Sequence, residues 1–370
     1  MLIAFLRICF FSVIGLIFSL DLYSTHIRAG EIIAKRISST SLTYEFTIIG
    51  YTDTGSEVEF GGGSFGFGDG NSIEVLDESA ISSQKILLKN NVALNLFKVI
   101  HTFQAPGRYV VSYFEQNRNA EIVNMENSVD TPFYIETEIL IDPFFGLNNT
   151  PVLLIPPIDN GILGIRYIHN PGAFDPDGDS LSYELVIPMQ EKEFQVTNYR
   201  FPNVEEFYQE YNEGSEGGLG PPSFSLDSII GDLIWDAPGS EGEYNFAFRV
   251  VEWRKVGDQW FKLGHVTRDM QVIIDDSDNK RPNLEVLDPI CVEAGTVIRD
   301  TVTGDDPNFN DIQIEAFGGP FEFLSSPAVY FPNPVQYQKS PASLQFEWQT
   351  NCSHIRKRPY DIQFKVTDKP

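Results

Sequence analysis

The fold of this chain is decided by a stretch of nine residues, Tyr244-Asn245-Phe246-Ala247-Phe248-Arg249-Val250-Val251-Glu252. Apolar side chains occupy every second position, which is the pattern of a β-strand with one face turned to a core. The pattern returns without a gap in Tyr360-Asp361-Ile362-Gln363-Phe364-Lys365-Val366-Thr367-Asp368. In both copies the closing acid falls on the buried face, where a carboxylate is costly unless something pairs with it. The repeat therefore predicts one all-β module used twice.

An acidic loop lies upstream of each copy of this strand. The first reads Phe174-Asp175-Pro176-Asp177-Gly178-Asp179, with carboxylates at alternate positions around a glycine that can take the bend. Hard cations such as Ca²⁺ prefer several oxygen ligands at once, so the spacing predicts a calcium loop. The alternative is a solvated Asp-Gly turn between strands. A weaker version, Asp305-Asp306-Pro307-Asn308-Phe309-Asn310-Asp311, precedes the second copy.

We expect each loop to share its cation with the acid that closes the strand downstream of it. The acidic stretch after the first copy is expected to contribute as well. The expected ligands are Asp175, Asp177, Asp179, Glu252, Asp276, Asp278, Asp306, Asn308, Asp311 and Asp368. The later site is expected to be weaker, because amide groups replace loop carboxylates. Since the cation would join carboxylates that otherwise repel one another, calcium is expected to stiffen the modules.

The length, composition and charge of the chain exclude some classes of protein and disfavour others. A chain of 370 residues is long enough for two or three domains with full cores, and 42% hydrophobic residues exclude wholesale disorder. A net charge of −26 argues against nucleic acid or an anionic membrane surface as partners, because both would repel the chain. The charge favours cations, or solubility outside the cell.

The N-terminus predicts secretion. Residues 1–7 carry one positive charge, residues 8–20 are almost wholly apolar, and Ser24 offers a small residue at a cleavage point. We expect a signal peptide at residues 1–24 and a secreted or cell-surface mature chain that does not insert into the membrane. The alternative is an N-terminal anchor, which the shortness of the apolar run disfavours, since a span needs about 20 residues.

Two cysteines remain after removal of the signal peptide, Cys291 and Cys352. In an oxidising compartment they are expected to form a disulfide that ties the start of the last segment to its later part. Two buried free thiols are the alternative, because the sequence does not give their separation.

A resemblance to a known family is carried by two motifs in the first third of the chain. Phe67-Gly68-Asp69-Gly70 and His101-Thr102-Phe103-Gln104-Ala105-Pro106-Gly107-Arg108-Tyr109-Val110-Val111 together resemble the signature of the polycystic kidney disease (PKD) domain, an immunoglobulin-like β-sandwich. The chain departs from the family at Phe65-Gly66, where Trp-Asp is usual. The resemblance implies a β-sandwich in this part of the chain.

The next segment resembles cadherin-like and related immunoglobulin-like repeats of bacterial surface proteins. The resemblance is carried by the Asp175 loop, by Gly231-Asp232-Leu233-Ile234-Trp235 and by the Tyr244–Glu252 strand. The stretch Asp275-Asp276-Ser277-Asp278-Asn279-Lys280-Arg281-Pro282 is similar to the calcium-ligating linker between cadherin domains, and its alternative is a solvated linker.

The expected fold class is all-β, with tandem immunoglobulin-like β-sandwich domains of PKD-like and cadherin-like type. The expected boundaries are a signal peptide at 1–24, a PKD-like domain at 25–150, a cadherin-like domain at 151–280 and a third sandwich at 281–370. Further domains are expected to follow if the chain is part of a longer protein.

As an ordered set, with Thr25-His26-Ile27-Arg28-Ala29-Gly30-Glu31-Ile32 after the signal peptide, these segments resemble secreted multidomain surface proteins of Bacteroidota of the gliding-motility-associated type. The resemblance implies a structural or adhesive surface protein, exported with the help of a C-terminal sorting domain. The expected partner is a surface protein or a polysaccharide.

Catalysis is not expected. The five histidines are scattered, and no zinc-binding spacing, nucleophile elbow or phosphate loop occurs. A pair of glycosidase carboxylates stays open, because such a pair is recognised by geometry alone. The alternative function is a carbohydrate-binding accessory module of a secreted polysaccharide-processing system, for which the candidate aromatics are Tyr199, Phe207, Trp253 and Trp260.

Overall fold

The chain folds almost entirely into β-strands. The computed structural model describes residues 27–55, 60–75, 81–286 and 288–369, so the expected signal peptide at residues 1–24 lies outside the described residues. Within these ranges the secondary structure consists of strands and short 3-10 turns, which confirms the all-β fold class. No helix in this part of the chain is long and apolar enough to cross a membrane.

The strands fall into three runs along the chain. The first run contains β1 (Ile27–Arg36), β2 (Thr43–Asp53), β3 (Ser64–Gly66), β4 (Ser72–Glu74), β5 (Ile81–Leu87), β6 (Val92–Thr102), β7 (Gly107–Glu115) and β8 (Phe133–Ile141). The second contains β9 (Val152–Leu153), β10 (Gly161–Ile162), β11 (Tyr167–His169), β12 (Ala173–Phe174), β13 (Ser180–Val186), β14 (Met189–Glu191), β15 (Phe194–Gln195), β16 (Ser223–Leu226), β17 (Leu233–Asp236), β18 (Gly242–Val256) and β19 (Gln259–Asp275). The third contains β20 (Asn283–Glu285), β21 (Val297–Asp305), β22 (Asp311–Gly318), β23 (Val329–Phe331), β24 (Ala342–Gln349) and β25 (Ile362–Lys369).

The 3-10 turns connect these strands. They are η1 (Ser128–Asp130), η2 (Glu205–Phe207), η3 (Tyr211–Glu213), η4 (Gly319–Glu322) and η5 (Cys352–His354). Between β15 and β16, residues 203–213 form two of these turns, η2 and η3, and no longer helix.

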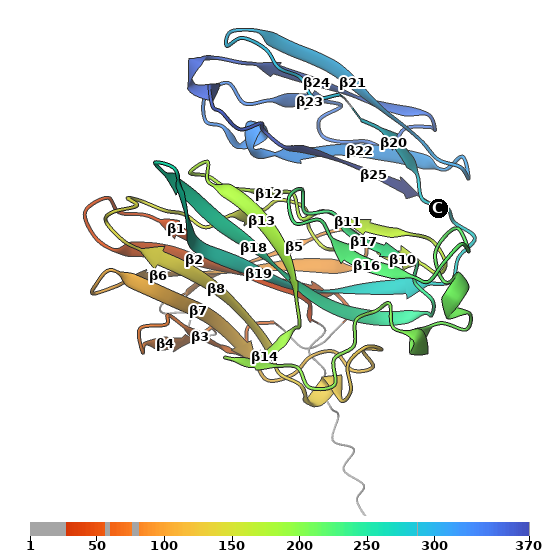
Figure 1. The fold of residues 1–370 in the computed structure, drawn as a ribbon, viewed down its shortest axis with the longest axis horizontal. Coiled ribbons are helices and arrows are strands. Elements are labelled where there is room, and N and C mark those ends of the chain that lie inside the picture. Colours follow the sequence, from red (N-terminus) through yellow and green to blue (C-terminus); the bar gives the residue numbers. More distant parts are fainter. Residues whose placement is uncertain (1–26, 56–59, 76–80, 287, 370) are drawn as a thin grey trace, which may run out of the picture.

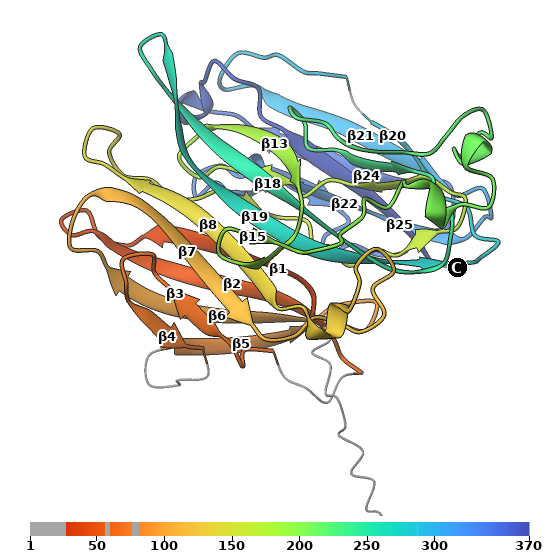
Figure 2. The same cartoon turned by 60° about the horizontal axis from the view of Figure 1, so that its bottom comes forward.

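The first run closes around an aromatic core. Its strands lie in one large sheet with the order β4-β3-β7-β8-β19-β1-β2-β6-β5, in which β19 comes from the second run, and this sheet folds back on itself (Figures 1 and 2). Phe46 of β2 and Phe65 of β3 come from different parts of this order, yet their rings lie 5.6 Å apart. Phe65 is fully buried at the position where the PKD pattern usually has Trp, so a smaller ring fills that part of the core.

The two PKD-like motifs contact each other. The imidazole of His101 stacks on Phe67 with ring centroids 4.0 Å apart, and its Nε2 lies 2.7 Å from a carboxylate oxygen of Asp69. His101 on β6 therefore supports the Phe67–Gly70 turn.

The hairpin of β18 and β19 joins the first and second runs into one sheet. β19 pairs with β18 from Gly242–Ile274 to Val256–Gln259, and its other edge pairs with β8 at Gly264–Val266 and with β1 at Asp269–Met270. Two of the expected domains therefore share backbone hydrogen bonds across the 150/151 boundary, although each has a hydrophobic cluster of its own. The division into domains stays a prediction.

A buried ion pair reinforces this junction. The guanidinium of Arg268 on β19 binds both carboxylate oxygens of Glu31 on β1, with Nη2 2.6 Å from Oε1, and both side chains are fully buried. Arg268 also donates to the backbone oxygen of Ile155 at 2.7 Å. A buried charge pair of this kind is sensitive to the loss of either partner.

The third run forms a sandwich of its own above the second (Figure 1). One layer has the order β20-β21-β24-β23, and the other contains β22 and β25. Leu344, Phe346 and Trp348 of β24 face Ile312 and Ile314 of β22 in a separate core. The module rests on the second run through contacts such as the ion pair between Lys365 and Asp159, at 2.6 Å.

The pairing of β8 with β19 leads to a first prediction. A Cβ at Gly264 would lie 1.9 Å from the backbone oxygen of Glu138, so Gly264→Ala must separate the two strands. We expect a loss of about 2 kcal/mol or more in the free energy of unfolding, as for other overpacked sites. Gly220→Ala, where no atom lies within 4 Å, is the matched control. Equal urea midpoints for both variants would contradict this account of the junction.

Candidate metal centre

The Asp175 loop, between β12 and β13, is organised around a single carboxylate oxygen. Asp175 Oδ1 accepts hydrogen bonds from the backbone N–H groups of Asp177 at 2.9 Å and Asp179 at 2.8 Å. The N–H of Gly178 donates to the backbone oxygen of Asp175, and Gly178 has a φ of 82°, which glycine adopts without strain. These bonds leave the second oxygen, Oδ2, free to face inward.

Three acidic side chains converge beside this loop. Glu252 lies on β18, four residues before the end of the strand, opposite Leu181 of β13. One carboxylate oxygen from each of Asp175, Asp179 and Glu252 lies within 4.8 Å of the others. Asp175 is 5% exposed and Glu252 is 1% exposed. Asp175 Oδ2 and Glu252 Oε1 are buried without a hydrogen-bond partner. Unpartnered buried carboxylate oxygens are costly, and a hard cation satisfies them.

Burial and mutual repulsion together raise the pKa values of Glu252 and Asp175. Burial raises the pKa of Glu252, and the neighbouring charge of Asp175 raises it further. Burial likewise raises the pKa of Asp175, against the backbone N–H bonds that favour its ionised form. In the absence of a cation, these two groups are therefore driven toward their neutral forms at a pH where ordinary carboxyls are ionised.

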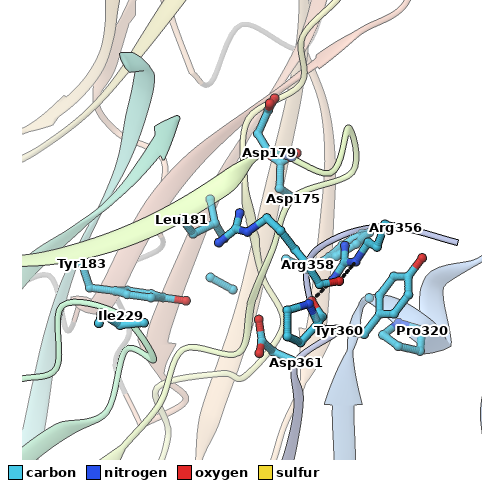
Figure 3. A pocket seen from close by; sticks show the side chains of 14 residues that line it. Asp175, Asp179, Leu181, Tyr183, Ile229, Pro320, Arg356, Arg358, Tyr360 and Asp361 are labelled. Carbon is cyan, nitrogen blue, oxygen red and sulfur yellow. Dashed lines mark hydrogen bonds between the residues drawn. The ribbon is translucent and has the colours of Figure 1, made fainter. Parts of the chain in front are cut away.

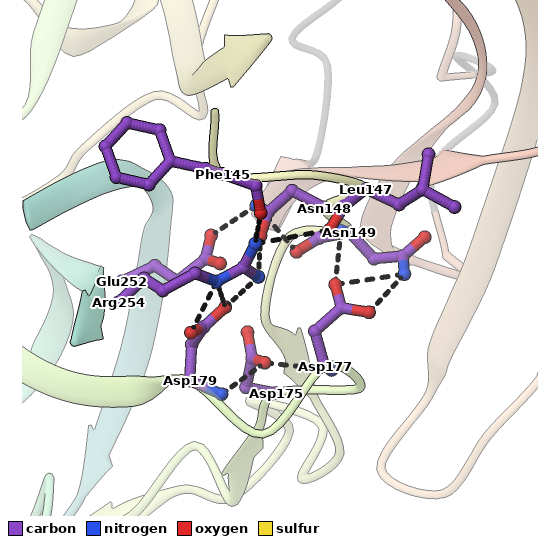
Figure 4. A network of polar contacts seen from close by, with 9 residues as sticks. All are labelled: Phe145, Leu147, Asn148, Asn149, Asp175, Asp177, Asp179, Glu252 and Arg254. Atoms are coloured by element: carbon purple, nitrogen blue, oxygen red, sulfur yellow. Dashed lines mark hydrogen bonds and ion pairs between the residues drawn. The ribbon is translucent and has the colours of Figure 1, made fainter. Parts of the chain in front are cut away.

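Arg254, which sequence reasoning missed, is part of the same cluster (Figure 4). Its guanidinium binds both oxygens of Asp179, donates to Asn148 Oδ1 at 2.5 Å and donates to the backbone oxygen of Phe145 at 2.6 Å. Three carboxylates and one guanidinium leave a formal charge of −3 + 1 = −2 when all are ionised. The cluster thus keeps a negative charge that a divalent cation would balance.

The linker before the second run closes over the loop. Asn148 Nδ2 donates to Glu252 Oε2 at 3.1 Å, and the backbone N–H of Asn149 donates to Asp177 Oδ2 at 2.6 Å. Asp177 therefore binds the linker and stands outside the group formed by Asp175, Asp179 and Glu252. In the sequence, the pair Asn148-Asn149 before Pro151 is the feature that could have pointed to these linker contacts.

The third module repeats this loop geometry. Asp306 Oδ1 accepts from the backbone N–H groups of Asn308 and Asn310, both at 2.9 Å, and Asp306 Oδ2 is buried without a partner. Phe309 takes the place of Gly178 with a φ of 62°. Asn310, and not the expected Asp311, holds the position of Asp179, because Asp311 is the exposed first residue of β22.

The linker contacts are repeated as well. Asn279 Nδ2 donates to Asp368, as Asn148 does to Glu252, and the N–H of Lys280 donates to Asn308 Oδ1 at 2.9 Å. Asn310 Nδ2 donates to Asn279 Oδ1 at 3.2 Å. The module is thus repeated together with the linker that covers it, at Asn148-Asn149-Thr150-Pro151 and Asn279-Lys280-Arg281-Pro282.

The structure brings Asp276 and Asp278 to neither cluster through their side chains, which are exposed. The N–H of Asp276 donates to Glu241 at 3.2 Å, and the backbone oxygen of Asp278 accepts from Asn308 at 3.4 Å. The linker therefore approaches the third-module loop through its backbone and Asn279.

The expected disulfide is not present in the structure. Cys291 and Cys352 are both free and exposed, so neither the pairing nor the buried alternative holds. The ladder of β21 and β24 ends before it reaches either cysteine. Its last contacts join Val297 to Gln349 and Thr296 to Thr350, and Cys352 begins the turn η5.

The aromatic candidates for carbohydrate binding are mostly internal. Phe207 is buried, Tyr199 packs in a small apolar cluster, and Trp253 donates to Ser182 at 2.9 Å. Trp260 is 50% exposed in the β18–β19 hairpin. These four residues do not form a shared aromatic platform.

The cluster of Asp175, Asp179 and Glu252 lies close to the contact between the second and third modules. A cavity of about 60 Å³ separates Asp175, Asp179 and Leu181 from Arg356 and Arg358 of the third module (Figure 3). Gly319 of the third module lies directly against the ring of Phe174, because a Cβ there would be 2.4 Å from it. The Asp175 loop therefore lies beside this contact.

Comparisons with known proteins give little beyond this geometry. No family model matches the chain, and no curated protein matches it. Among solved structures, the chain has a slight likeness to the Down Syndrome Cell Adhesion Molecule (DSCAM) isoform 1.30.30, N-terminal eight Ig domains, with 9% identity and a TM-score of 0.17. The match covers 92% of this chain and 42% of that one. A TM-score this low carries no argument, so the fold assignment rests on the strand pairing itself.

The raised pKa values of Asp175 and Glu252 predict a pH dependence. Their neutral forms stabilise the fold below the unfolded pKa of about 4, and this contribution is lost as the pH rises through the higher folded values. With a chelator present, we expect Glu252→Gln to gain stability over the parent as the pH rises from 5 to 8, by about 1 kcal/mol or more. Thermal unfolding measures the difference.

Glu210→Gln, at an exposed position, is the matched control and is expected to follow the parent at every pH. A Glu252→Gln variant that also follows the parent would show that Glu252 is ordinarily ionised in the folded chain.

Proposed function

We propose that this chain is a secreted or cell-surface structural and adhesive protein whose tandem β-sandwich modules are stiffened by Ca²⁺. One observation carries the proposal. The Asp175 loop and the Asp306 loop each bury an unpartnered carboxylate oxygen, and each lies under an asparagine linker. Oxygen ligands, buried negative charge and a repeated geometry are the features that a structural calcium site needs.

In the second module, the ligands would be Asp175, Asp179 and Glu252. In the third, they would be Asp306 and Asp368 with the amide oxygen of Asn310, whereas Asn308 binds the linker as Asp177 does. Each linker asparagine binds the acid that closes a strand, so a bound cation would hold linker, loop and strand together. The mechanism is passive, because the ion would convert repulsion among carboxylates into rigidity.

Stiffening matters most between the second and third modules. The first two runs already share a sheet through β19, whereas the third module has its own sheets and is joined by residues 276–282. A cation at the Asp306 loop would fix Asn279 and Lys280 and thereby the angle between the modules. The module order and the acidic charge of −26 support a role at the cell surface, of the gliding-motility-associated type, with a surface protein or polysaccharide as partner.

Calcium binding at the first site is tested by thermal unfolding. At a calcium concentration about 100-fold above the dissociation constant, binding adds about 2.7 kcal/mol, so the midpoint should rise by several degrees over that in chelator. Asp175→Asn is expected to lose most of this rise, because it removes the charge and keeps the shape. Asp227→Asn, at an exposed turn, is the matched control. An unchanged midpoint for the parent chain would rule out the metal.

The second site is tested through the shape of the molecule. We expect small-angle scattering to show a smaller maximum dimension and a narrower distance distribution in calcium than in chelator, because the linker to the third module is then held. Asp306→Asn should abolish this difference, whereas Asp175→Asn should leave most of it. Identical scattering curves in calcium and chelator would contradict the stiffening of this linker.

A further inference from the structure

The longest run of basic residues in this acidic sequence lies where the third module meets the second. It is Arg356-Lys357-Arg358, just before the repeated strand. When the two copies of that strand are aligned, Arg356 and Arg358 correspond to Ser240 and Gly242 of the second module. A module of this kind therefore folds without basic residues at these positions, and the two arginines point to a role outside the core of their own module.

Both arginines line the cavity that separates the third module from the Asp175 loop (Figure 3). The side chain of Arg358 extends into the cavity, whereas Arg356 lies against its own module, with its guanidinium carbon 3.5 Å from the ring centroid of Tyr360. Arg356 Nε also donates to the backbone oxygen of Arg358 at 2.9 Å. Arg356 therefore holds the stretch of backbone from which Arg358 reaches the cavity.

The opposite wall of the cavity belongs to the first acidic cluster. Asp175, Asp179 and Leu181 line this wall. Leu181 pairs with Glu252 in the ladder of β13 and β18, so these two side chains lie on the same face of the sheet. Arg358 therefore enters the cavity on the side where the three carboxylates converge.

The charges on the two sides of the cavity are opposite. Three ionised carboxylates with Arg254 leave a formal charge of −2 on the cluster. On the side of the third module, two guanidinium groups and the carboxylate of Asp361 leave a formal charge of +1. Burial lowers the pKa of Arg356, and the charge of Asp175 is one of those that oppose this shift. The two sides therefore attract each other while the cluster holds no cation.

A divalent cation in the cluster would remove this attraction. It would bring the formal charge of the cluster to zero, and the guanidinium group in the cavity would repel the cation itself. Contacts away from the cluster hold the modules together in either case, namely those of Gly319 with Phe174 and of Lys365 with Asp159. The effect of the arginines is therefore expected in the affinity for the cation and not in the arrangement of the modules.

We propose that Arg358, held in place by Arg356, is a built-in counter-charge that lowers the affinity of the Asp175 site for a divalent cation. The inference rests on the proposed calcium site and adds the regulation of that site by the third module. Because coupling between binding free energies is reciprocal, a cation at this site weakens the docking of the third module by the same factor. A displacement of the third module that withdraws Arg358 would in turn raise the affinity of the site.

Titration calorimetry with Ca²⁺ tests the role of Arg358. The parent for this series is the Asp306→Asn chain, so that the heat reports on the Asp175 site alone. Arg358→Gln is expected to lower the dissociation constant about fivefold, at the low end of couplings between sites, because solvent screens the exposed Arg358. Arg358→Lys keeps the charge and should stay close to the parent, which separates loss of charge from a disturbed loop.

Lys357→Gln is the matched control. It removes the same charge from the position between the two arginines, but Lys357 does not line the cavity. Its dissociation constant should stay within about twofold of that of the parent, because a charge in solvent is largely screened. The difference between Arg358→Gln and the parent should also shrink as the salt concentration rises from about 0.05 M to about 0.5 M.

Three results would overturn the inference. Equal dissociation constants for Arg358→Gln and the parent would show that Arg358 does not act on the site, and they would leave the proposed calcium site intact. An equal gain in affinity for Lys357→Gln and Arg358→Gln would show that only the net charge of the loop matters. The absence of calcium binding in the parent would overturn both this inference and the proposed site at Asp175.

Discussion

The structure depends on the requirement that a central β-strand finds a hydrogen-bonding partner on each edge. β19 meets it with β18 on one side and with β8 and β1 on the other. This arrangement makes one sheet of two sandwich modules and buries the pair of Glu31 and Arg268 at their junction. The close approach at Gly264 follows from it, because a side chain there would keep β8 away.

Buried acids give the molecule its second organising feature. Glu252 closes an otherwise apolar strand face, and Asp175 faces it from the neighbouring loop. When Asp175 and Glu252 are both ionised, they repel each other in a site of low polarity. When they are neutral, each still has a buried oxygen without a hydrogen-bond partner. A divalent cation would relieve both the repulsion and the unpartnered oxygens, whereas Arg254 pairs with Asp179 only. The same arrangement around Asp306 shows that loop, linker and strand end form one repeated unit.

The sequence predicted much of this unit and misassigned some of its members. Alternation in residues 244–252 and 360–368 was enough to identify the repeat, because side-chain direction in a strand depends only on position along the chain. The loops were visible for a similar reason, since their hydrogen bonds join near neighbours. Arg254, Asn148 and Asn310 were missed, because their partners are chosen by how distant segments meet.

By itself, the sequence determined the all-β class, the repeated strand and the acidic turns, since each depends on local periodicity and turn chemistry. Only the tertiary structure decided that the first two runs share a sheet and that Cys291 and Cys352 stay free. These features depend on strand register and on which edges meet. Register is set by the packing of whole layers, and no short stretch of the chain contains that information.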